Sequence, residues 1–452
     1  LHGHRGQRAG DRGGDGGAGI TLGQGGTLDF QIVTGGAGGA GGSGGIQPDS
    51  LDYPGFGPIG ASGTGGTGGA GVIVANGSAV MVPGSAAIAG GAGGSALPGT
   101  AGRFSGTGNG GNGGAVGAGM LFSSGATLTN NGTITAGNGR AGGDANMTRN
   151  AVRLGVAGNG GDGGAGVVFM GGGTLTNNGT ITAGSGGAGG VSLDYSGLAG
   201  SNGSGVVFSG GAGSLINRTA ATINGGVVMD NFTNAVTLET GSTVNGDLNL
   251  TTNTGSTLTL TGSGSATYSH AVTGVTTFTG SFAKTGSGTW TLDQSLTYTG
   301  TTTINAGTLN LTGSLGATAV SVASGATLGG EGSIGAGGSL TLNDGSALLI
   351  AGDTPGALSV DGNLTLNGLI DVNVTGLGTT PSAVVLNYDG SLIGSAANFT
   401  LSQAPGRTPV FSTATPHQIE LSFLGKALTW SGATSAWDLK TSANWNAGLD
   451  TF

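Results

Sequence analysis

The sequence predicts an all-β protein: an elongated parallel β-helix (β-solenoid) with Gly-rich loops. The first observation is an internal repeat, since TLTNNGTITAG occurs at Thr127–Gly137 and again, letter for letter, at Thr174–Gly184. Such a repeat indicates one structural unit stacked several times. The second is composition: 108 of 452 residues are Gly and only 7% are charged, yet Thr, Val, Ile and Leu stand in short alternations. Strands and turns are therefore favoured over disorder.

The repeating unit reads as three short strands joined by two tight corners. A short apolar run such as Val167–Phe169 is followed by a Gly turn and then by Thr174–Thr176. The corner Asn177–Gly179 leads into Thr180–Ala183. Asn and Gly tolerate the positive φ values that such corners demand. One unit is therefore predicted to form one coil.

Parallel stacking is preferred over hairpins, although Asn-Gly is also a strong hairpin signal. Strands of three or four residues make marginal hairpins, whereas stacked copies would place Asn on Asn and Leu on Leu. The Gly tracts, such as Gly35–Gly45 and Gly184–Gly190, read equally as loops extruded from the solenoid or as tightly packed coils. A Pro-rich interruption at Pro48–Pro58 is interpreted as an inserted surface loop rather than a recognition loop.

Two Gly tracts resemble ligand motifs without matching them. GGDGGAG at Gly13–Gly19 and at Gly160–Gly166 is similar to the calcium-binding nonapeptide G-G-x-G-x-D-x-U-x. The sixth position is Ala18 or Ala165 rather than Asp, so no calcium site is predicted. The G-x-G-x-x-G spacing within Gly35–Gly45 does not stand in a βαβ unit and carries no nucleotide signal.

From about Val227 the Gly tracts thin out and alternation of period two takes over. Segments such as Thr257–Thr261 and Ile370–Val374 place apolar residues on one face and polar residues on the other. They recur about every 20 residues, a typical coil length for a β-solenoid. The coils are expected to continue to about Leu449.

These changes in composition and periodicity divide the chain into four segments. Residues 1–18 are predicted to be a disordered Gly/Arg-rich terminus, and 19–226 a Gly-rich repeat region forming solenoid coils. Residues 227–427 are predicted to form a Thr/Leu/Asn-rich β-helix that includes a distinctive repeat at 282–313. Residues 428–452 are interpreted as the start of a further, truncated repeat block.

Charge and cysteine content narrow the function classes. The net charge is −9 and the basic residues are not clustered, which argues against nucleic-acid binding. Without Cys the chain has neither disulfides nor thiolate metal sites. The sequence contains no run of 18 apolar residues, so no membrane-spanning helix is predicted. The opening LHGHRGQR lacks the apolar region of a signal peptide, so we expect the chain to be a fragment whose start lies upstream.

The stretch FAKTGSGTWTLDQSLTYTGTTTINAGTLNLTG at Phe282–Gly313 follows the pattern K-x-G-x-G-T-L-x-L and then N-T-Y-T-G-x-T-x-I-x-x-G-T-L. It departs from it at Trp290, where Leu is usual, and at Ser295-Leu296. The stretch resembles the autotransporter-associated β-strand repeat. The matching residues are Lys284, Gly286, Gly288, Thr289, Leu292, Thr297, Tyr298, Thr299, Gly300, Thr302, Ile304, Gly307, Thr308 and Leu309.

Two further stretches are similar to segments of autotransporter passengers. They are Ala351–Val374 and the Trp-containing Leu428–Asn446. In the second, Trp430, Trp437 and Trp445 are interpreted as core or cap packing rather than as a platform for glycan stacking.

The resemblance implies a secreted passenger of a type V system, folded as a right-handed parallel β-helix. Such a passenger follows a signal peptide and is displayed at the outer surface of a Gram-negative bacterium. Its export partner would be a C-terminal outer-membrane β-barrel, expected beyond these residues. The absence of Cys agrees with export of an unfolded chain through a pore.

The leading functional hypothesis is a non-enzymatic, Gly-rich adhesin: a surface scaffold for adhesion or cell–cell aggregation. Its partners would be glycans or proteins of host or neighbouring cells, or further copies of itself, since a long surface of small polar residues suits weak multivalent contact. The alternatives are a β-helix enzyme that degrades polysaccharide, or a Gly-rich filament protein without self-export.

Enzymatic activity is not expected, because glycoside hydrolysis requires a carboxylate pair at a defined separation. The 21 acidic residues, Glu239, Glu331 and Glu420 among them, are scattered. Asp beside Gly is typical of turns. No catalytic, cofactor-binding or metal-binding residue is therefore predicted. The weak candidates for catalysis are Asp344, Asp353 and Asp361, which fall close in sequence, and the isolated His270 and His417.

Overall fold

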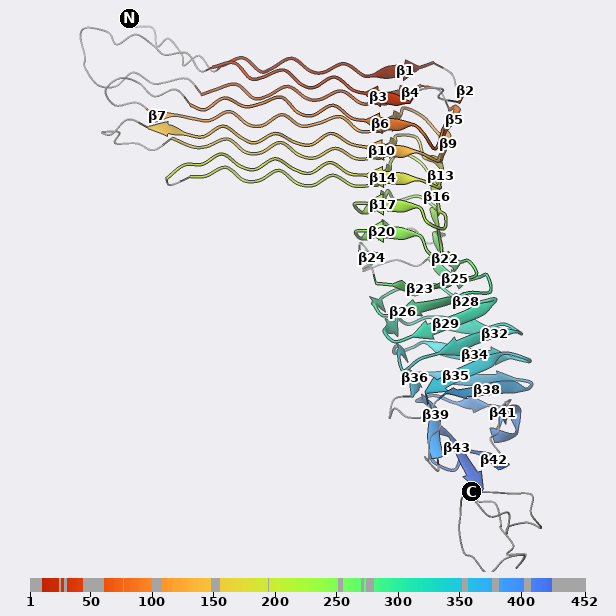
Figure 1. Cartoon of the computed structure of the whole chain (residues 1–452). Helices are drawn as coiled ribbons and strands as arrows, with labels where there is room; N and C mark the ends of the chain where they lie inside the picture. The colour runs from red at the N-terminus through yellow and green to blue at the C-terminus, as the bar shows by residue number, and fades with distance from the viewer. Residues whose placement is uncertain are drawn as a thin grey trace, which may run out of the picture.

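The protein consists of a column of stacked β-coils and a flat bundle of Gly-rich tracts that projects sideways from the N-terminal half of the column (Figure 1). Within the described residues no helix is long and apolar enough to span a membrane. The computed structural model describes residues 10–23, 26–27, 31–43, 61–75, 77–99, 107–147, 155–193, 195–250, 255–269, 272–273, 280–351, 357–375, 382–401 and 408–424.

In the N-terminal half each coil contributes one strand to each of three parallel sheets. The eight-stranded sheet contains β1 (Ile20–Leu22), β4 (Val72–Val74), β8 (Met120–Phe122), β12 (Val167–Phe169), β15 (Val206–Phe208), β18 (Val227–Met229), β21 (Leu248–Leu250) and β24 (Val272–Thr273). The six-stranded sheet contains β3 (Ile32–Thr34), β6 (Ala87–Ala89), β10 (Thr133–Thr135), β14 (Thr180–Thr182), β17 (Thr222–Asn224) and β20 (Thr243–Asn245).

A third sheet runs along both halves of the column and joins them into one solenoid. Its thirteen strands are β2 (Gly26–Thr27), β5 (Ala79–Val82), β9 (Ala126–Asn130), β13 (Gly173–Asn177), β16 (Gly213–Asn217), β19 (Ala235–Glu239), β22 (Thr257–Thr261), β25 (Ser281–Lys284), β28 (Thr302–Ile304), β31 (Ala319–Val322), β34 (Ser339–Asn343), β37 (Asn363–Asn367) and β40 (Leu392–Ile393).

The C-terminal half replaces the other two sheets with two sheets of seven strands. One contains β23 (Ser265–Tyr268), β26 (Thr289–Leu292), β29 (Gly307–Leu311), β32 (Ala326–Gly329), β35 (Ala347–Ala351), β38 (Ile370–Thr375) and β41 (Phe399–Leu401). The other contains β27 (Ser295–Leu296), β30 (Ser314–Leu315), β33 (Ser333–Ile334), β36 (Leu358–Val360), β39 (Ser382–Tyr388), β42 (Thr408–Ser412) and β43 (Gln418–Leu424). A short 3-10 helix, η1, spans Ala396–Asn398.

The predicted parallel register is confirmed. β13 pairs with β9 in parallel, and Thr174 lies opposite Thr127 and Leu175 opposite Leu128. Identical sequence segments therefore stack on one another, as the repeat indicates. The alternation of period two also holds, because in β22 the two leucines are buried while the threonines between them are half-buried.

Inward-facing side chains form columns along the solenoid axis. The rings of Phe122, Phe169 and Phe208 lie in successive coils, with centroids 4.6 and 4.7 Å apart and nearly parallel planes. All three side chains are fully buried. Offset stacking of aromatic rings at such distances adds stabilisation beyond the burial of their area.

A buried column of asparagines confirms the predicted stacking of Asn on Asn at the corner. Asn130 Nδ2 donates to Asn177 Oδ1 at 2.8 Å, and Asn177 Nδ2 donates to Asn217 Oδ1 at 2.9 Å. The column ends where Asn217 Nδ2 donates to the Thr243 carbonyl at 3.0 Å. Each buried amide thus has partners, as buried polar groups require.

Two predictions about the ends of the solenoid differ from the structure. Residues 10–18 were predicted to be disordered but form a hydrogen-bonded Gly-rich tract, because their backbone pairs with neighbouring tracts. The coils were expected to continue to Leu449, yet β39 pairs antiparallel with β43, and β43 pairs antiparallel with β42. Parallel stacking therefore ends in an antiparallel segment within the described residues.

The Asn column generates the first test. Replacing Asn177 with Ala removes one link and leaves the Asn130 amide and the Asn217 carbonyl oxygen without that partner. We expect a loss of about 2 kcal/mol in the free energy of unfolding, the order expected for unpaired buried polar groups. Urea unfolding followed by circular dichroism measures it. The matched control is Asn178→Ala, since Asn178 is exposed; equal shifts for the two variants would contradict the account.

Candidate functional site

The bundle is made of Gly-rich tracts that leave the solenoid after one sheet and return before another. Outgoing tracts follow strands of the six-stranded sheet, and returning tracts precede strands of the eight-stranded sheet. At the far tip, β7 (Thr107–Gly108) pairs antiparallel with β11 (Asn146–Met147). The outgoing tracts are 35–43, 89–99, 136–145 and 183–191; the returning tracts are 10–19, 61–71, 109–119, 155–166 and 195–205.

Hydrogen bonds between tracts repeat every three residues. The N–H groups of Gly65 and Gly68 donate to carbonyls of the parallel returning tract of the next coil, at 3.0 and 3.1 Å. The N–H groups of Gly66 and Gly69 donate to Gly39 and Gly36 of an antiparallel outgoing tract, both at 2.8 Å. A period of three without internal bonds is the pattern of polyproline II helices. The bundle is thus two layers of such helices, outgoing and returning.

Space dictates the glycines at two of every three positions. A Cβ at Gly65 would lie 2.0 Å from the Gly94 carbonyl oxygen, and one at Gly114 would lie 2.1 Å from that of Gly66. A Cβ could be placed there only if the backbone shifted, so most of the triplets read Gly-Gly-X. The structure settles the two interpretations of the Gly tracts: they are extruded from the solenoid and also packed tightly against one another (Figure 1).

The third position of each triplet faces outward, and Asn or Asp there has a specific task. Its side-chain oxygen accepts the N–H at the outward position of the next tract in the same layer. Asn112 Oδ1 accepts from Asn159 N at 2.8 Å, and Asp162 Oδ1 accepts from Ser201 N at 2.7 Å. Equivalent acceptors are Asp15, Asn109, Asn138, Asp144 and Asn159.

This pairing gives a role to the acidic residue of each GGDGGAG motif. Asp15 and Asp162 accept backbone N–H groups within their layer. Hydrogen bonds from Thr67, and secondarily the nearby Arg12 guanidinium, hold the pKa of Asp15 below its usual value. Sequence reasoning missed the role, although a polar residue at every third position between Gly pairs was its signal.

Some positions of the Gly pattern carry other residues, among them Val116, Ala157 and Arg140. Arg140 occupies a place that Gly137 and Gly143 fill three residues to either side. Its N–H lies 3.5 Å from the Gly114 carbonyl, whereas Gly137 and Gly143 make the corresponding bonds at 3.1 and 2.8 Å. The packing is therefore looser at Arg140. Sequence reasoning did not single this residue out, and only the register of the triplets reveals it.

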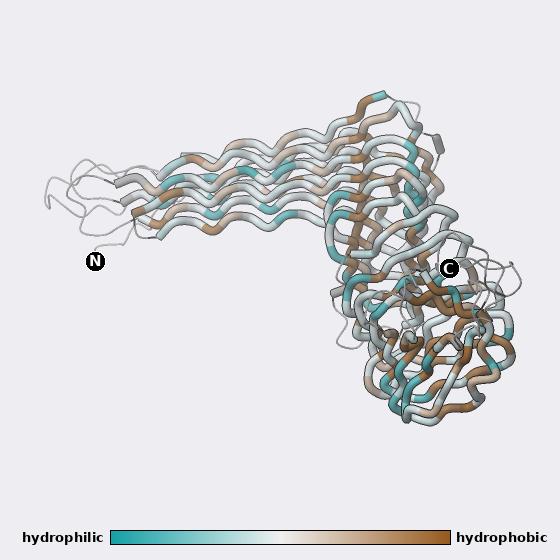
Figure 2. Tube along the Cα trace, turned by 60° about the horizontal axis from the view of Figure 1, so that its bottom comes forward, coloured by the Kyte–Doolittle hydropathy of each residue, from teal (hydrophilic) through white to brown (hydrophobic). Residues whose placement is uncertain are grey.

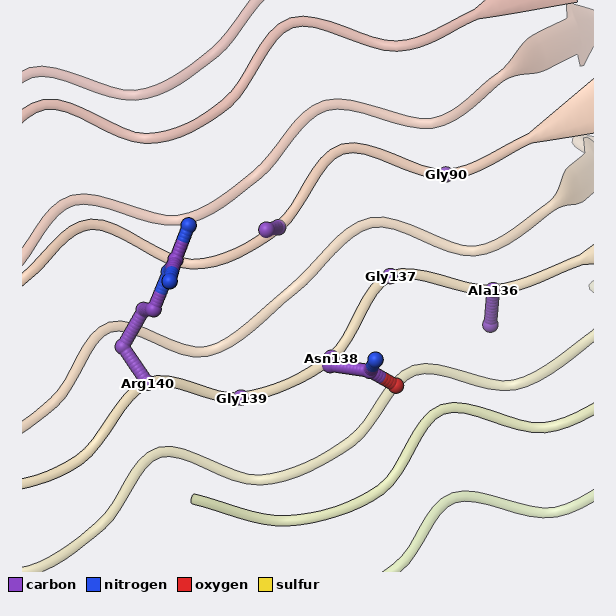
Figure 3. A pocket seen from close by; sticks show the side chains of 7 residues that line it. Gly90, Ala136, Gly137, Asn138, Gly139 and Arg140 are labelled. Atoms are coloured by element: carbon purple, nitrogen blue, oxygen red, sulfur yellow. The ribbon is translucent and has the colours of Figure 1, made fainter.

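Arg140 borders a small groove on the outgoing layer. Its side chain crosses toward the neighbouring outgoing tract (Figure 3), where Nε donates to the Gly93 carbonyl at 3.3 Å. The groove has a volume of about 280 Å³ and is lined by Gly90, Ala92 and residues 136–140. Asn138 Oδ1 is engaged by Ser185 N at 2.9 Å.

The second notable feature is a buried lysine in the C-terminal half. Lys284, at the end of β25, is fully buried, and its Nζ donates to the carbonyls of Thr285, Gly286 and Ala306, each at 2.8 Å. Burial lowers the pKa of this ammonium group. Gly307 has φ +66, and a Cβ there would lie 2.8 Å from Nζ. The lysine and the glycine thus close one corner of the coil.

Other residues of the repeat at Phe282–Gly313 also serve packing. Trp290 Nε1 donates to the Thr261 carbonyl at 2.8 Å, so the departure from Leu is accommodated by a partner for the indole. The Tyr298 hydroxyl contacts Thr302 Oγ1, and burial raises the pKa of this phenol. Thr302 Oγ1 lies 2.9 Å from Thr318 Oγ1. The motif is therefore explained by corner and core contacts.

The structure does not gather the scattered acidic and histidine candidates into a site. Asp344 Oδ1 accepts the Leu369 N–H at 2.7 Å, Glu239 pairs with Arg218 at 2.7 Å, and Glu420 accepts from Thr415. The His417 ring lies 5.6 Å from that of Tyr388. In the part of the chain that the structure describes, no group of three or more His, Asp or Glu could hold a metal ion.

Several sequence predictions concern residues outside the described ranges. They are the loop at 48–58, Asp353, His270, the block at 428–452 and the three tryptophans Trp430, Trp437 and Trp445. Their interpretations stay predictions.

Comparison with known proteins confirms the predicted resemblance. Residues 282–311 match the family model of the passenger-associated-transport-repeat. This segment of the chain thus carries a repeat that is associated with autotransporter passengers. No curated protein matches the chain.

Two solved structures show weaker likenesses. The autotransporter UpaB from E. coli strain CFT073 is 12% identical with a TM-score of 0.36, over 91% of this chain and 100% of that chain. A springtail antifreeze protein from Granisotoma rainieri, described as a nine polyproline type II helical bundle, is 24% identical with a TM-score of 0.14. That match covers 44% of this chain and 94% of the springtail chain. Both TM-scores are too low to establish a shared fold.

The Gly rule of the bundle can be tested at Gly114. Gly114→Ala places a Cβ within 2.1 Å of the Gly66 carbonyl oxygen and 2.6 Å of the Gly94 nitrogen. We expect the bundle to lose roughly 1–3 kcal/mol, as overpacking does, with faster limited proteolysis within 61–119 and an unchanged solenoid spectrum. The control Ala115→Ser changes an exposed outward position. Similar cleavage rates for both variants would show that the packing is not tight.

The buried lysine gives a separate prediction. Lys284→Met keeps the length of the side chain but removes the donor from the half-buried carbonyls of Thr285, Gly286 and Ala306. We expect a loss of about 3 kcal/mol in the free energy of unfolding, measured in urea. Ala283→Ser, on the half-buried neighbouring position, is the control and should shift the midpoint little. A Lys284→Met protein as stable as the parent would refute a stabilising role for the ammonium group.

Proposed function

We propose that this chain is the surface-exposed passenger of an autotransporter and that it acts as a non-enzymatic scaffold for adhesion or aggregation of cells. The observation that carries the proposal is the bundle, which holds two faces of small and polar side chains out from the solenoid. At about 3.1 Å per residue, tracts of about ten residues extend roughly 30 Å. Figure 2 shows pale or hydrophilic residues over most of this bundle.

The composition of these faces suits weak, repeated contact. Outward positions carry hydrogen-bonding residues such as Thr64, Thr67, Asn112 and Ser201. Some outward positions also carry exposed apolar residues, such as Val191 and Leu198. One such contact is weak, but many copies on one cell surface multiply it into avidity. The partners we propose are glycans or proteins on host or neighbouring cells, or further copies of this chain.

The catalytic alternative has less support. The acidic side chains of Asp344, Glu239 and Glu420 are all engaged in hydrogen bonds or an ion pair. A glycosidase would need two carboxyl groups facing each other across a substrate. The described residues present no such pair beside the groove at Arg140.

The test uses beads coated with the purified chain. We expect coated beads to aggregate or to adhere to cells, and a Gly66→Ala, Gly114→Ala double variant to lose this activity, because its bundle is disrupted while its solenoid persists. Beads coated with the Ala115→Ser variant are the control. Equal adhesion by the double variant would sink the proposal, and release of reducing sugar from polysaccharide by the chain would favour the enzyme instead.

A further inference from the structure

Arg140 stands where close packing calls for glycine. The corresponding residues of the flanking outgoing tracts include Gly94 and Gly187, and a Cβ at either meets backbone atoms within 2.1 Å. The protein accepts a looser backbone contact, 3.5 Å from Arg140 N to Gly114 O, to carry this side chain. Other departures from the Gly pattern, such as Val116 and Ala157, are apolar and at least partly buried, whereas Arg140 carries an exposed cationic side chain. Residues that break a local rule in this way are candidates for a functional role.

The guanidinium group is available for a ligand. Only Nε is engaged, with the Gly93 carbonyl, and Arg140 has no acidic partner within 4 Å among the described residues. The described part of the bundle carries one other basic residue, Arg12, which is paired with Asp15 at 2.7 Å. In a chain of net charge −9, Arg140 is thus the one positive group on the outgoing face among the described residues.

The groove beside it limits the size of the ligand. Its volume of about 280 Å³ lies just below the usual lower end of about 300 Å³ for small-molecule pockets. Gly and Ala form most of its wall, so a flat ring can lie against the backbone without meeting large side chains (Figure 3). One ring-sized unit with one anionic group fits this space.

We propose that the groove at Arg140 binds a carboxylate-bearing sugar residue of a surface polysaccharide. The planar guanidinium fork matches a carboxylate in a bidentate geometry. A nucleic acid would need several clustered cations, and a protein hot spot would need aromatic or large anchors; the groove offers neither. The inference rests on the proposed adhesive function and names the class of ligand.

The experiment measures binding of the purified full chain to immobilised hyaluronan, which carries one carboxylate per disaccharide, with neutral dextran and dextran sulfate as comparisons. We expect binding to hyaluronan that weakens with salt. Arg140→Gln and Arg140→Gly should weaken it at least about tenfold, because a charge-assisted pair is lost. Arg140→Lys should recover only part of the binding, and Arg12→Gln should leave it unchanged.

Arg140→Gly also guards against misfolding, since it restores the Gly pattern and should protect the bundle from proteolysis at least as well as the parent chain. Undiminished hyaluronan binding by this variant, equal binding of dextran, or binding of dextran sulfate alone would each overturn the inference. If coated beads adhere to cells while the parent chain does not bind hyaluronan, this inference fails and the proposed adhesive function stands.

Discussion

The solenoid and the bundle both depend on one interaction: the backbone hydrogen bond between a residue and its counterpart one coil later. In the solenoid it forms between Leu128 and Leu175 and their neighbours, in parallel register. In the bundle it forms from Gly65 to the tract of the next coil, every third residue. Because the same coil-to-coil step serves both parts, coils that include Gly-rich tracts build the column and the projecting bundle together.

The two parts satisfy this constraint by opposite means. The solenoid fills its interior with side chains, such as the stacked Phe122, Phe169 and Phe208. The bundle has almost no side chains between its layers, and backbone atoms pack directly on backbone atoms. Glycine costs conformational entropy on folding, which the dense network between tracts offsets. Outward positions are then free to vary, and there the Asn and Asp acceptors complete the network.

Much of the solenoid could be predicted from the sequence because its strand and corner segments repeat. The exact copy at Thr127–Gly137 and Thr174–Gly184 predicted the parallel register and the Asn column. The Gly tracts were ambiguous, since a Gly-Gly-X pattern suits a loose loop as well as a packed helix until its neighbours are known. The sequence identified Lys284 only as a matching residue of the repeat motif. Its three carbonyl partners are brought together by the fold, so composition and spacing could not predict them. The antiparallel segment that begins at β39 has no periodic pattern in its sequence that would have predicted it.

The packing of the Gly-rich tracts is the central claim, and residue-resolved hydrogen exchange of the whole chain tests it most directly. Two of every three amides in tracts 61–71 and 109–119 donate to another tract, and the outward amide generally does not. The account predicts slow exchange at Gly65, Gly66, Gly68 and Gly69 and fast exchange at Thr64. It also predicts slow exchange at Thr67, whose N–H meets Asp15. Uniformly fast exchange through these tracts would contradict it.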